Sequence, residues 1–289
     1  TTDIFAGTFS AGNRTKVSDE ARESLATKLV TPTLADPNKM QVERIEGVIT
    51  NSRGADLKGH FHNANAQNGS VNTDKVVLFL SGSGGSCEDY SKDIANKYTE
   101  KGVSVMAVNY RGFSDNAGIP SENGLYKDAR AMFNYLTTPE PNGRGIAPQN
   151  VIIHGFSLGG PVAANLVKEL KNEAVPINVK GLVLDRPMAS MKGAVIGSTG
   201  SSIAASLSKK YVGSFDIEKK LNTLPNRDIP IVLTTDRDFL HDVGENLRTK
   251  ARDMGFNVVG QTYDVEHEDS ASLMDKVSYW NNISNTLLT

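Results

Sequence analysis

The pattern of apolar and polar positions changes twice along the chain. Residues 1–40 are mostly polar and predict a single helix, from Ser18 to about Leu29. Two segments then alternate between apolar and polar positions, over 41–50 and 55–63, with the turn-forming sequence NSRGAD between them. Alternation with a period of two predicts strands with one buried face, so this region predicts an antiparallel hairpin.

Short, continuously apolar runs follow from residue 75 onward. Strands of this kind are typical of parallel sheets, because both faces of such a sheet are covered. The six runs are KVVLFL (75–80), VSVMAVN (103–109), NVIIHG (150–155), VKGLVLD (179–185), IPIVLTT (229–235) and NVVGQTYD (257–264). Apolar residues at helical spacing recur between them, in 87–102, 123–138, 158–173 and 242–255. This order predicts an α/β protein with a doubly wound, mostly parallel sheet.

One connection is much longer than the others. Residues 188–221 lie between two predicted strands and exceed the length of an ordinary loop, so they predict a small cap insertion. We expect the cap to belong to one domain over 41–289, with 1–40 as a polar, partly helical extension. A chain of 289 residues is long enough to bury one large core.

Composition narrows the class of protein. The chain has 31 Lys and Arg against 33 Asp and Glu, so it lacks the basic excess expected of a nucleic-acid-binding protein. The single cysteine, Cys87, cannot form an intramolecular disulfide, which favours a reducing compartment. No apolar run approaches the roughly 18 residues of a membrane span, and the first twenty residues lack the apolar core of a secretory signal. We therefore expect a soluble protein.

The sharpest predicted turn is GFSLG, residues 155–159, between a strand and a helix. A serine hydroxyl attacks a carbonyl carbon only when it stands clear of the backbone and a base removes its proton. The GxSxG turn gives that exposure, because glycines two positions before and after the serine leave room for a strained backbone. Pro161 falls in the first helical turn, where its missing N–H costs little. We interpret Ser157 as a nucleophile rather than a turn residue.

A serine nucleophile also needs two N–H donors for the oxyanion that forms on the carbonyl oxygen. We expect the N–H of Leu158, at the start of the helix, to be one of these donors. We expect the second donor in the loop FLSGSGGS, which follows an earlier strand, at the N–H of Ser83. A dinucleotide-binding function for this loop is excluded, because Cys87 stands where the last glycine of GxGxxG is required.

The base and the acid should follow the serine in the order acid, then histidine. Only His241 and His267 lie downstream, and we favour His267 because it follows the last predicted strand, whereas His241 begins a helix. For the acid we prefer Asp238, in the loop after IPIVLTT, over Asp236. Asp185, at the end of VKGLVLD, is the second alternative.

Other reactive side chains have simpler interpretations. We expect His154 to be a buried side chain beside the turn and Cys87 to be an inert thiol. His60 and His62 share a strand face without a third ligand in reach, so we predict no metal site and no cofactor. The lysine pairs 209/210 and 219/220 predict solvated faces.

Several motifs together resemble the α/β-hydrolase superfamily over residues 41–285. They are VVLFLSGSGGSCEDY, VNYRGFSDNAGIPSENGLYKDARAMFNYL and NVIIHGFSLGGPVAANL, with LVLDRP and IPIVLTTDRD. The resemblance implies the α/β-hydrolase fold and a nucleophile, acid, base and two oxyanion donors at Ser157, Asp238, His267, Ser83 and Leu158. Two departures stand out. Ser81 replaces the usual His before the loop glycine, and residues 234–235 are Thr-Thr instead of His-Gly.

The chain also resembles the α/β-hydrolase effector domain of the multifunctional autoprocessing RTX toxins. That resemblance implies a phospholipase A1 acting on phosphatidylinositol 3-phosphate in the host cytosol, in peripheral contact with an endosomal membrane surface. It implies that the cap admits an acyl chain, and that the phosphorylated headgroup binds to basic residues drawn from Arg186, Lys192, Lys209 and Lys210. The alternatives are a cytoplasmic carboxylesterase, thioesterase or serine peptidase, or a hydrolase-fold module that binds without catalysis. The sequence predicts no oligomeric state.

Overall fold

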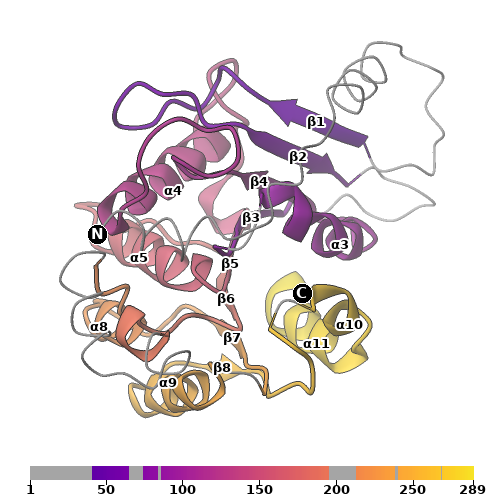
Figure 1. The fold of residues 1–289 in the computed structure, drawn as a ribbon, viewed down its shortest axis with the longest axis vertical. Helices are drawn as coiled ribbons and strands as arrows, with labels where there is room; N and C mark the ends of the chain where they lie inside the picture. The colour runs from indigo at the N-terminus through magenta and orange to yellow at the C-terminus, as the bar shows by residue number, and fades with distance from the viewer. Residues whose placement is uncertain (1–40, 65–73, 84–85, 195–212, 238–239, 268) are drawn as a thin grey trace.

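The computed structural model describes residues 41–64, 74–83, 86–194, 213–237, 240–267 and 269–289 (Figure 1). The expected helix from Ser18 to Leu29 and the rest of the 1–40 extension lie outside these residues, as does the middle of the expected cap. The proposed division into an extension, one domain and a cap therefore stays a prediction.

A single sheet of eight strands forms the centre of the described structure, in the order β1-β2-β4-β3-β5-β6-β7-β8. The strands are β1 Gln41–Ile45, β2 Gly59–Asn63, β3 Val76–Leu80, β4 Ser104–Val108, β5 Val151–Phe156, β6 Gly181–Asp185, β7 Ile231–Thr234 and β8 Val258–Val259. β1 pairs antiparallel with β2, and β2 with β4, while every pairing from β4 to β8 is parallel. The predicted hairpin and the mostly parallel sheet are confirmed.

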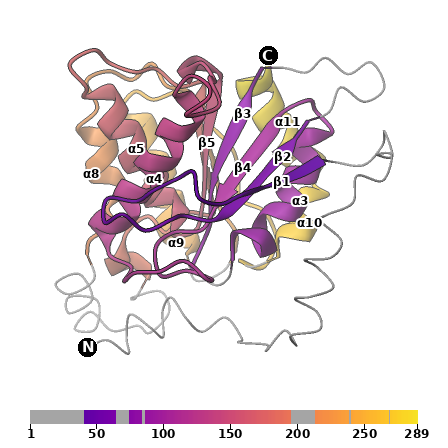
Figure 2. The ribbon, with the colours of Figure 1, turned by 90° about the horizontal axis from the view of Figure 1, so that it is seen from above.

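Helices cover both faces of the sheet, as Figure 2 shows from above. The helices are α3 Cys87–Thr99, α4 Glu122–Thr137, α5 Gly159–Lys171, α8 Ile217–Asn222, α9 His241–Asp253, α10 Ser270–Met274 and α11 Val277–Ile283. Short helical turns also lie at Pro148–Asn150 and Ser284–Leu288. α4, α5, α8 and α9 lie on one face, and α3, α10 and α11 on the other (Figures 1 and 2). The four helices expected between the strands are present as α3, α4, α5 and α9, whereas α8, α10 and α11 were not predicted.

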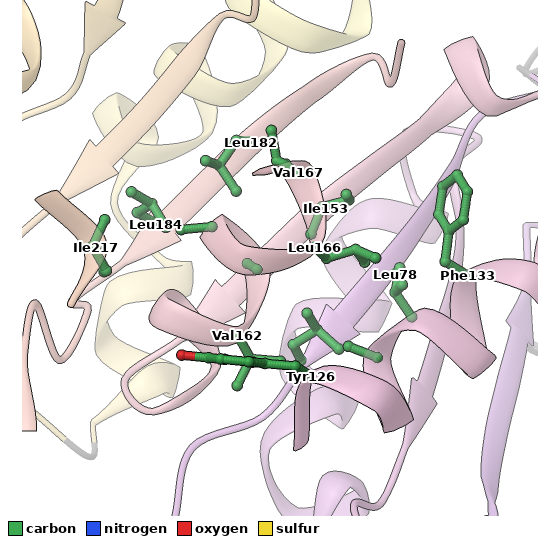
Figure 3. Packing of buried hydrophobic residues seen from close by; sticks show 14 of the residues in the cluster. Leu78, Tyr126, Phe133, Ile153, Val162, Leu166, Val167, Leu182, Leu184 and Ile217 are labelled. Carbon is green, nitrogen blue, oxygen red and sulfur yellow. The ribbon is translucent and has the colours of Figure 1, made fainter. Parts of the chain in front are cut away.

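The core on the α5 side fixes that helix against the sheet (Figure 3). Leu182 and Leu184 of β6 and Ile153 of β5 belong to the same buried cluster as Val162 and Leu166 of α5. All residues of β3, β5, β6 and β7 are buried, which explains their continuously apolar sequences. Each fully buried aliphatic side chain contributes about 1.5–3 kcal/mol. The N-terminus of α5 is therefore held at a fixed place on the sheet edge.

The candidate catalytic residues lie at one edge of the sheet, where the parallel strands end. The segments that leave β3, β5, β6 and β7 all begin at the carboxyl ends of adjacent strands. Crevices at this edge of open α/β sheets are where ligands bind. Every candidate catalytic residue named above follows one of these strands or β8, except Asp185, which is the last residue of β6.

Candidate active site

Ser157 occupies a strained turn between β5 and α5. Its φ is +51°, in the left-handed region that non-glycine residues rarely adopt. A Cβ on Gly155 would overlap the carbonyl of Gly159, and a Cβ on Gly159 would overlap that of Leu80. The Ser157 N–H donates to the carbonyl of Asp185 at 3.1 Å, which ties the turn to the neighbouring strand. The two glycines are therefore steric requirements of the turn, as the motif predicted.

His267 lies between a hydroxyl and a carboxylate. Its Nε2 is 2.9 Å from Ser157 Oγ, and its Nδ1 is 2.6 Å from Asp236 Oδ2. The side chains of His267 and Asp236 are buried, and the imidazole stacks on the Phe156 ring at a centroid distance of 5.4 Å. Because an ionised carboxylate can only accept, Nδ1 carries the proton of the neutral ring. Nε2 is then left to accept the serine proton.

Among the described residues, the carboxylate that contacts His267 Nδ1 is that of Asp236, whereas the sequence favoured Asp238. Asp238 lies outside the described residues. The position of Asp236 follows from strand pairing: Thr235 forms a parallel bridge with Thr262, one residue beyond the end of β7. The chain leaves the sheet immediately after that bridge, so Asp236 is the first side chain at the edge. The preference for Asp238 assumed a later exit from the strand.

Asp185, the other alternative acid, is engaged elsewhere. Its carboxylate accepts hydrogen bonds from Thr234 Oγ1 at 2.8 Å, Arg186 Nε at 3.1 Å and the Tyr279 hydroxyl at 3.3 Å. Burial opposes the charged form, yet the positive charge of Arg186 prevails and holds the pKa of the Asp185 carboxyl well below its ordinary value. Asp185 is therefore an ionised, internal partner of Arg186 rather than of His267.

Arg186 does not present its charge to solvent, so its expected role in headgroup binding is wrong. Its side chain is 0% exposed, and its guanidinium lies 4.7 Å from the Phe156 ring centroid. Burial of this cation is possible because Asp185 and backbone carbonyls surround it. Lys192 is exposed, and Lys209 and Lys210 lie outside the described residues.

The lysines of α8 differ from each other. Lys219 is exposed as expected, but Lys220 is buried, and its Nζ lies 3.6 Å from Glu122 Oε1 and 5.1 Å from the Tyr126 ring centroid. Burial lowers the pKa of Lys220, although Glu122 and Asp216 oppose that shift. The prediction of a solvated face is wrong for Lys220.

The loop after β3 lies beside the nucleophile. A Cβ on Gly82 would come within 3.3 Å of Ser157 Cβ and 3.1 Å of the Phe156 ring. Ser83, half-buried, follows directly in this loop. Leu158 precedes α5 with φ −56° and ψ −33°, so its N–H belongs to the first turn of the helix. Of the two predicted donor residues, Leu158 thus follows the serine directly at the start of α5, and Ser83 lies in the loop that approaches the serine.

His154 and Cys87 have polar partners other than the serine hydroxyl. His154 is buried, and its Nδ1 is 3.1 Å from the Tyr98 hydroxyl. Cys87 is buried at the start of α3, where its N–H donates to Asn109 Oδ1 at 2.7 Å. Within the described ranges, no cluster of three or more His, Cys, Asp or Glu side chains could hold a metal ion. Within the same ranges, no helix has the length and apolar character needed to cross a membrane.

Comparison with known proteins places this geometry in a family. Residues 71–254 match the family model described as serine aminopeptidase, S33, which covers more than half of the chain. The chain therefore belongs to this family of α/β hydrolases, and it is a serine hydrolase of the α/β-hydrolase type. The predicted fold and family resemblance are confirmed.

Individual relatives narrow the comparison. A crystal structure of an α/β hydrolase from Vibrio vulnificus superposes with a TM-score of 0.77 and 35% identity, covering 99% of this chain and 92% of that one. The multifunctional-autoprocessing repeats-in-toxin protein of Vibrio vulnificus is 40% identical over 85% of this chain, which spans only 5% of the toxin's length. The lysophosphatidylserine lipase ABHD12 of Danio rerio is 29% identical over 49% of this chain and 34% of its own length.

Proposed function

We propose that the protein hydrolyses carboxylic esters with Ser157 as nucleophile, His267 as base and Asp236 as acid. The observation that carries the proposal is the continuous line of contacts from Asp236 Oδ2 through the His267 ring to Ser157 Oγ, at 2.6 and 2.9 Å. Asp236 takes the role that the sequence assigned to Asp238. These three groups have the donor and acceptor order that acyl transfer requires.

Acylation begins when Ser157 Oγ bonds to the ester carbonyl carbon while its proton moves to His267 Nε2. Asp236 stays ionised and stabilises the resulting imidazolium through the Nδ1–H. The ester C–O bond then breaks, and Nε2–H gives its proton to the departing alcohol oxygen. Water repeats the sequence on the acyl-enzyme, releasing the fatty acid and restoring the serine.

The negative charge that develops on the carbonyl oxygen needs donors fixed in advance. We assign these to the N–H groups of Leu158 and Ser83, because one begins α5 next to the nucleophile and the other follows Gly82, which approaches Ser157. Loss of one such donor typically costs about 10²–10³ in kcat.

For the substrate, we propose a phospholipid ester, cleaved as a phospholipase A1 cleaves it, with phosphatidylinositol 3-phosphate as the preferred lipid. The similarity to a lysophosphatidylserine lipase supports a lipid substrate. The 40% identity to the toxin supports the resemblance to its effector domain, which implies phosphatidylinositol 3-phosphate. The function as a toxin effector, the peripheral contact with a host membrane, and an acyl-chain site in the cap at 188–221 belong to this proposal. Because Arg186 is buried, the remaining candidates for binding the headgroup are Lys192, Lys209 and Lys210.

A peptidase is the second candidate, because the matching family model is described as a serine aminopeptidase. The same nucleophile and base would serve peptide cleavage, so the two candidates are separated by the substrates that are turned over.

The test is hydrolysis of a phosphoinositide panel in phosphatidylcholine vesicles, with short p-nitrophenyl esters and aminoacyl p-nitroanilides in parallel. We expect the wild-type protein to release sn-1 fatty acid fastest from phosphatidylinositol 3-phosphate. Ser157→Ala should abolish release, whereas Ser272→Ala, at an exposed serine on α10, should leave it unchanged. Turnover of the anilides alone would favour the peptidase, turnover of short esters alone a carboxylesterase, and equal turnover by Ser157→Ala would refute the mechanism.

A further inference from the structure

Arg186 connects the end of β6 to the loop that carries His267. Its Nη1 is 2.8 Å from the carbonyl oxygen of His267, 3.3 Å from that of Glu266 and 3.4 Å from that of Asp269. One guanidinium nitrogen therefore reaches three backbone carbonyls within four residues of chain. The contacted carbonyl groups belong to His267 itself and to residues before and after it in the chain.

The loop around His267 has little regular structure of its own. Between the Thr262 bridge and the start of α10 at Ser270, no described residue belongs to a helix or strand. A loop without a hydrogen-bonded ladder holds a side chain in place only through contacts to the rest of the protein. The guanidinium is such a contact, and it acts on the backbone of the base itself.

Arg186 is in turn fixed by a buried anion. Nε lies 3.1 Å from Asp185 Oδ1 and Nη2 lies 3.4 Å from Asp185 Oδ2, so the planar group is held on one side while Nη1 reaches the loop. Thr234 of β7 and Tyr279 of α11 hold the same carboxylate. The planar fork of arginine makes this two-sided arrangement possible, whereas the point charge of lysine does not reproduce it.

Phe156 provides a second connection between Arg186 and His267. The guanidinium carbon of Arg186 lies 4.7 Å from the centroid of the Phe156 ring, and the His267 imidazole stacks on that ring with an interplanar angle of 25°. Phe156 directly precedes the nucleophile. The base is therefore positioned through its backbone by Arg186 and through its ring by Phe156 and Asp236.

We propose that Arg186, anchored by Asp185, is a positioning residue that holds the His267 loop and so sets the distance from the imidazole to Ser157. The inference rests on the proposed function and deepens it. Neither Arg186 nor Asp185 touches the substrate in this proposal; both act through the backbone of the base.

This role predicts a particular kinetic signature. A shift of about 1 Å in a catalytic group far from the altered residue costs on the order of 100-fold in rate. Arg186→Lys keeps a positive charge but loses the fork, so we expect kcat to fall by about 100-fold. KM should stay within about threefold, because substrate contacts are unchanged.

Arg111 provides a matched control. It is also a buried arginine just after a strand, and it is held by one carboxylate, with Nε 3.1 Å and Nη2 2.6 Å from Asp128 Oδ1. Within the described residues, the side-chain hydrogen bonds of Arg111 go to Asp128 and Ser52, and none reaches the loop of His267. Arg111→Lys should therefore lower the thermal midpoint as much as Arg186→Lys does while leaving kcat unchanged for the folded protein.

A readout independent of turnover is the low-field proton resonance of His267 Nδ1–H, which reports its hydrogen bond to Asp236. We expect the resonance in wild type and Arg111→Lys, and its loss or displacement in Arg186→Lys. Should Arg186→Lys fail to fold, Thr234→Val removes one hydrogen bond to Asp185 and should change kcat and the resonance in the same direction, to a smaller extent.

The outcomes separate this inference from the proposed function. Wild-type kcat and an unshifted resonance in Arg186→Lys, or in Thr234→Val where the first variant does not fold, would overturn the positioning role. An equal loss of kcat in Arg111→Lys would also overturn it, since any buried ion pair would then suffice. If wild type turned over no ester at all, the proposed function would fail, whereas the resonance would still test whether Arg186 positions His267.

Discussion

The replacement of Asp236 by asparagine tests the assignment of the acid. Asparagine has the size of aspartate, and the site is buried, so the geometry around His267 should persist. The amide nitrogen of asparagine donates, however, and an Nδ1 that accepts from it leaves the proton on Nε2. In that tautomer the imidazole cannot accept the proton of Ser157, although the distance of 2.9 Å is unchanged.

The magnitude follows from the loss of the base. The corresponding aspartate-to-asparagine change in a serine protease triad lowers kcat about 10⁴-fold. At about 1.36 kcal/mol per tenfold change, this is about 5.4 kcal/mol of transition-state stabilisation. We therefore expect Asp236→Asn to lower kcat on a p-nitrophenyl ester by about 10⁴-fold, with a circular dichroism spectrum like that of wild type.

Asp238→Asn is the control, because the sequence alone favoured that residue. We expect this variant to keep kcat within about threefold, since His267 Nδ1 already has Asp236 as its partner. The reasoning would be refuted if Asp236→Asn kept more than a tenth of wild-type kcat, or if Asp238→Asn lost as much as Asp236→Asn.

Three further predictions follow from the geometry. Gly159→Ala forces a Cβ into the Leu80 carbonyl, so it should lower the thermal midpoint and abolish ester hydrolysis; normal activity would show that the turn relaxes. Asp185→Asn leaves the Arg186 charge buried without its partner and should cost about 3–5 kcal/mol at neutral pH in urea unfolding. Because folding lowers the pKa of Asp185, its contribution is present above about pH 4 and is lost as pH falls through the lower folded value, so the difference between wild type and variant should shrink in acid; a constant difference would contradict this. Cys87 is buried, so it should react with Ellman's reagent only after unfolding, and rapid reaction of the native protein would contradict its placement.

The sequence predicted the elements whose signals are local. The turn at Ser157 follows from two glycines and a proline within seven residues, and the strands from continuously apolar runs. His267 was predicted from its order in the chain, because only two histidines lie downstream of the serine. These features depend on neighbouring residues or on simple counting.

What the sequence did not predict depends on contacts between distant segments. The contact between Asp236 and His267 depends on the point where the chain leaves the sheet, after the bridge from Thr235 to Thr262, 27 residues away. The burial of Arg186 depends on carbonyl groups about 80 residues further along the chain, one of them that of His267. The sequence Asp185-Arg186 at the end of an apolar strand does not indicate that backbone carbonyl groups near His267 bind the arginine.

The two C-terminal helices were missed because they are short, with 5 residues in α10 and 7 in α11. Helices of this length show too little periodicity to be recognised. One signal was present: Asp269 accepts a hydrogen bond from the N–H of Ser272 at 2.9 Å, which is an N-cap that the sequence DSAS suggests. Tyr279, which holds Asp185, lies on α11 and was missed with it.

The central claim is that Ser157 is a nucleophile activated by His267. The most direct measurement is mass spectrometry of the protein after reaction with a fluorophosphonate, which modifies a serine only when its hydroxyl is activated. We predict one adduct per chain, on the peptide that contains Ser157, and none when His267 is replaced by alanine. A native protein that stays unmodified, or an adduct on another serine, would contradict the account.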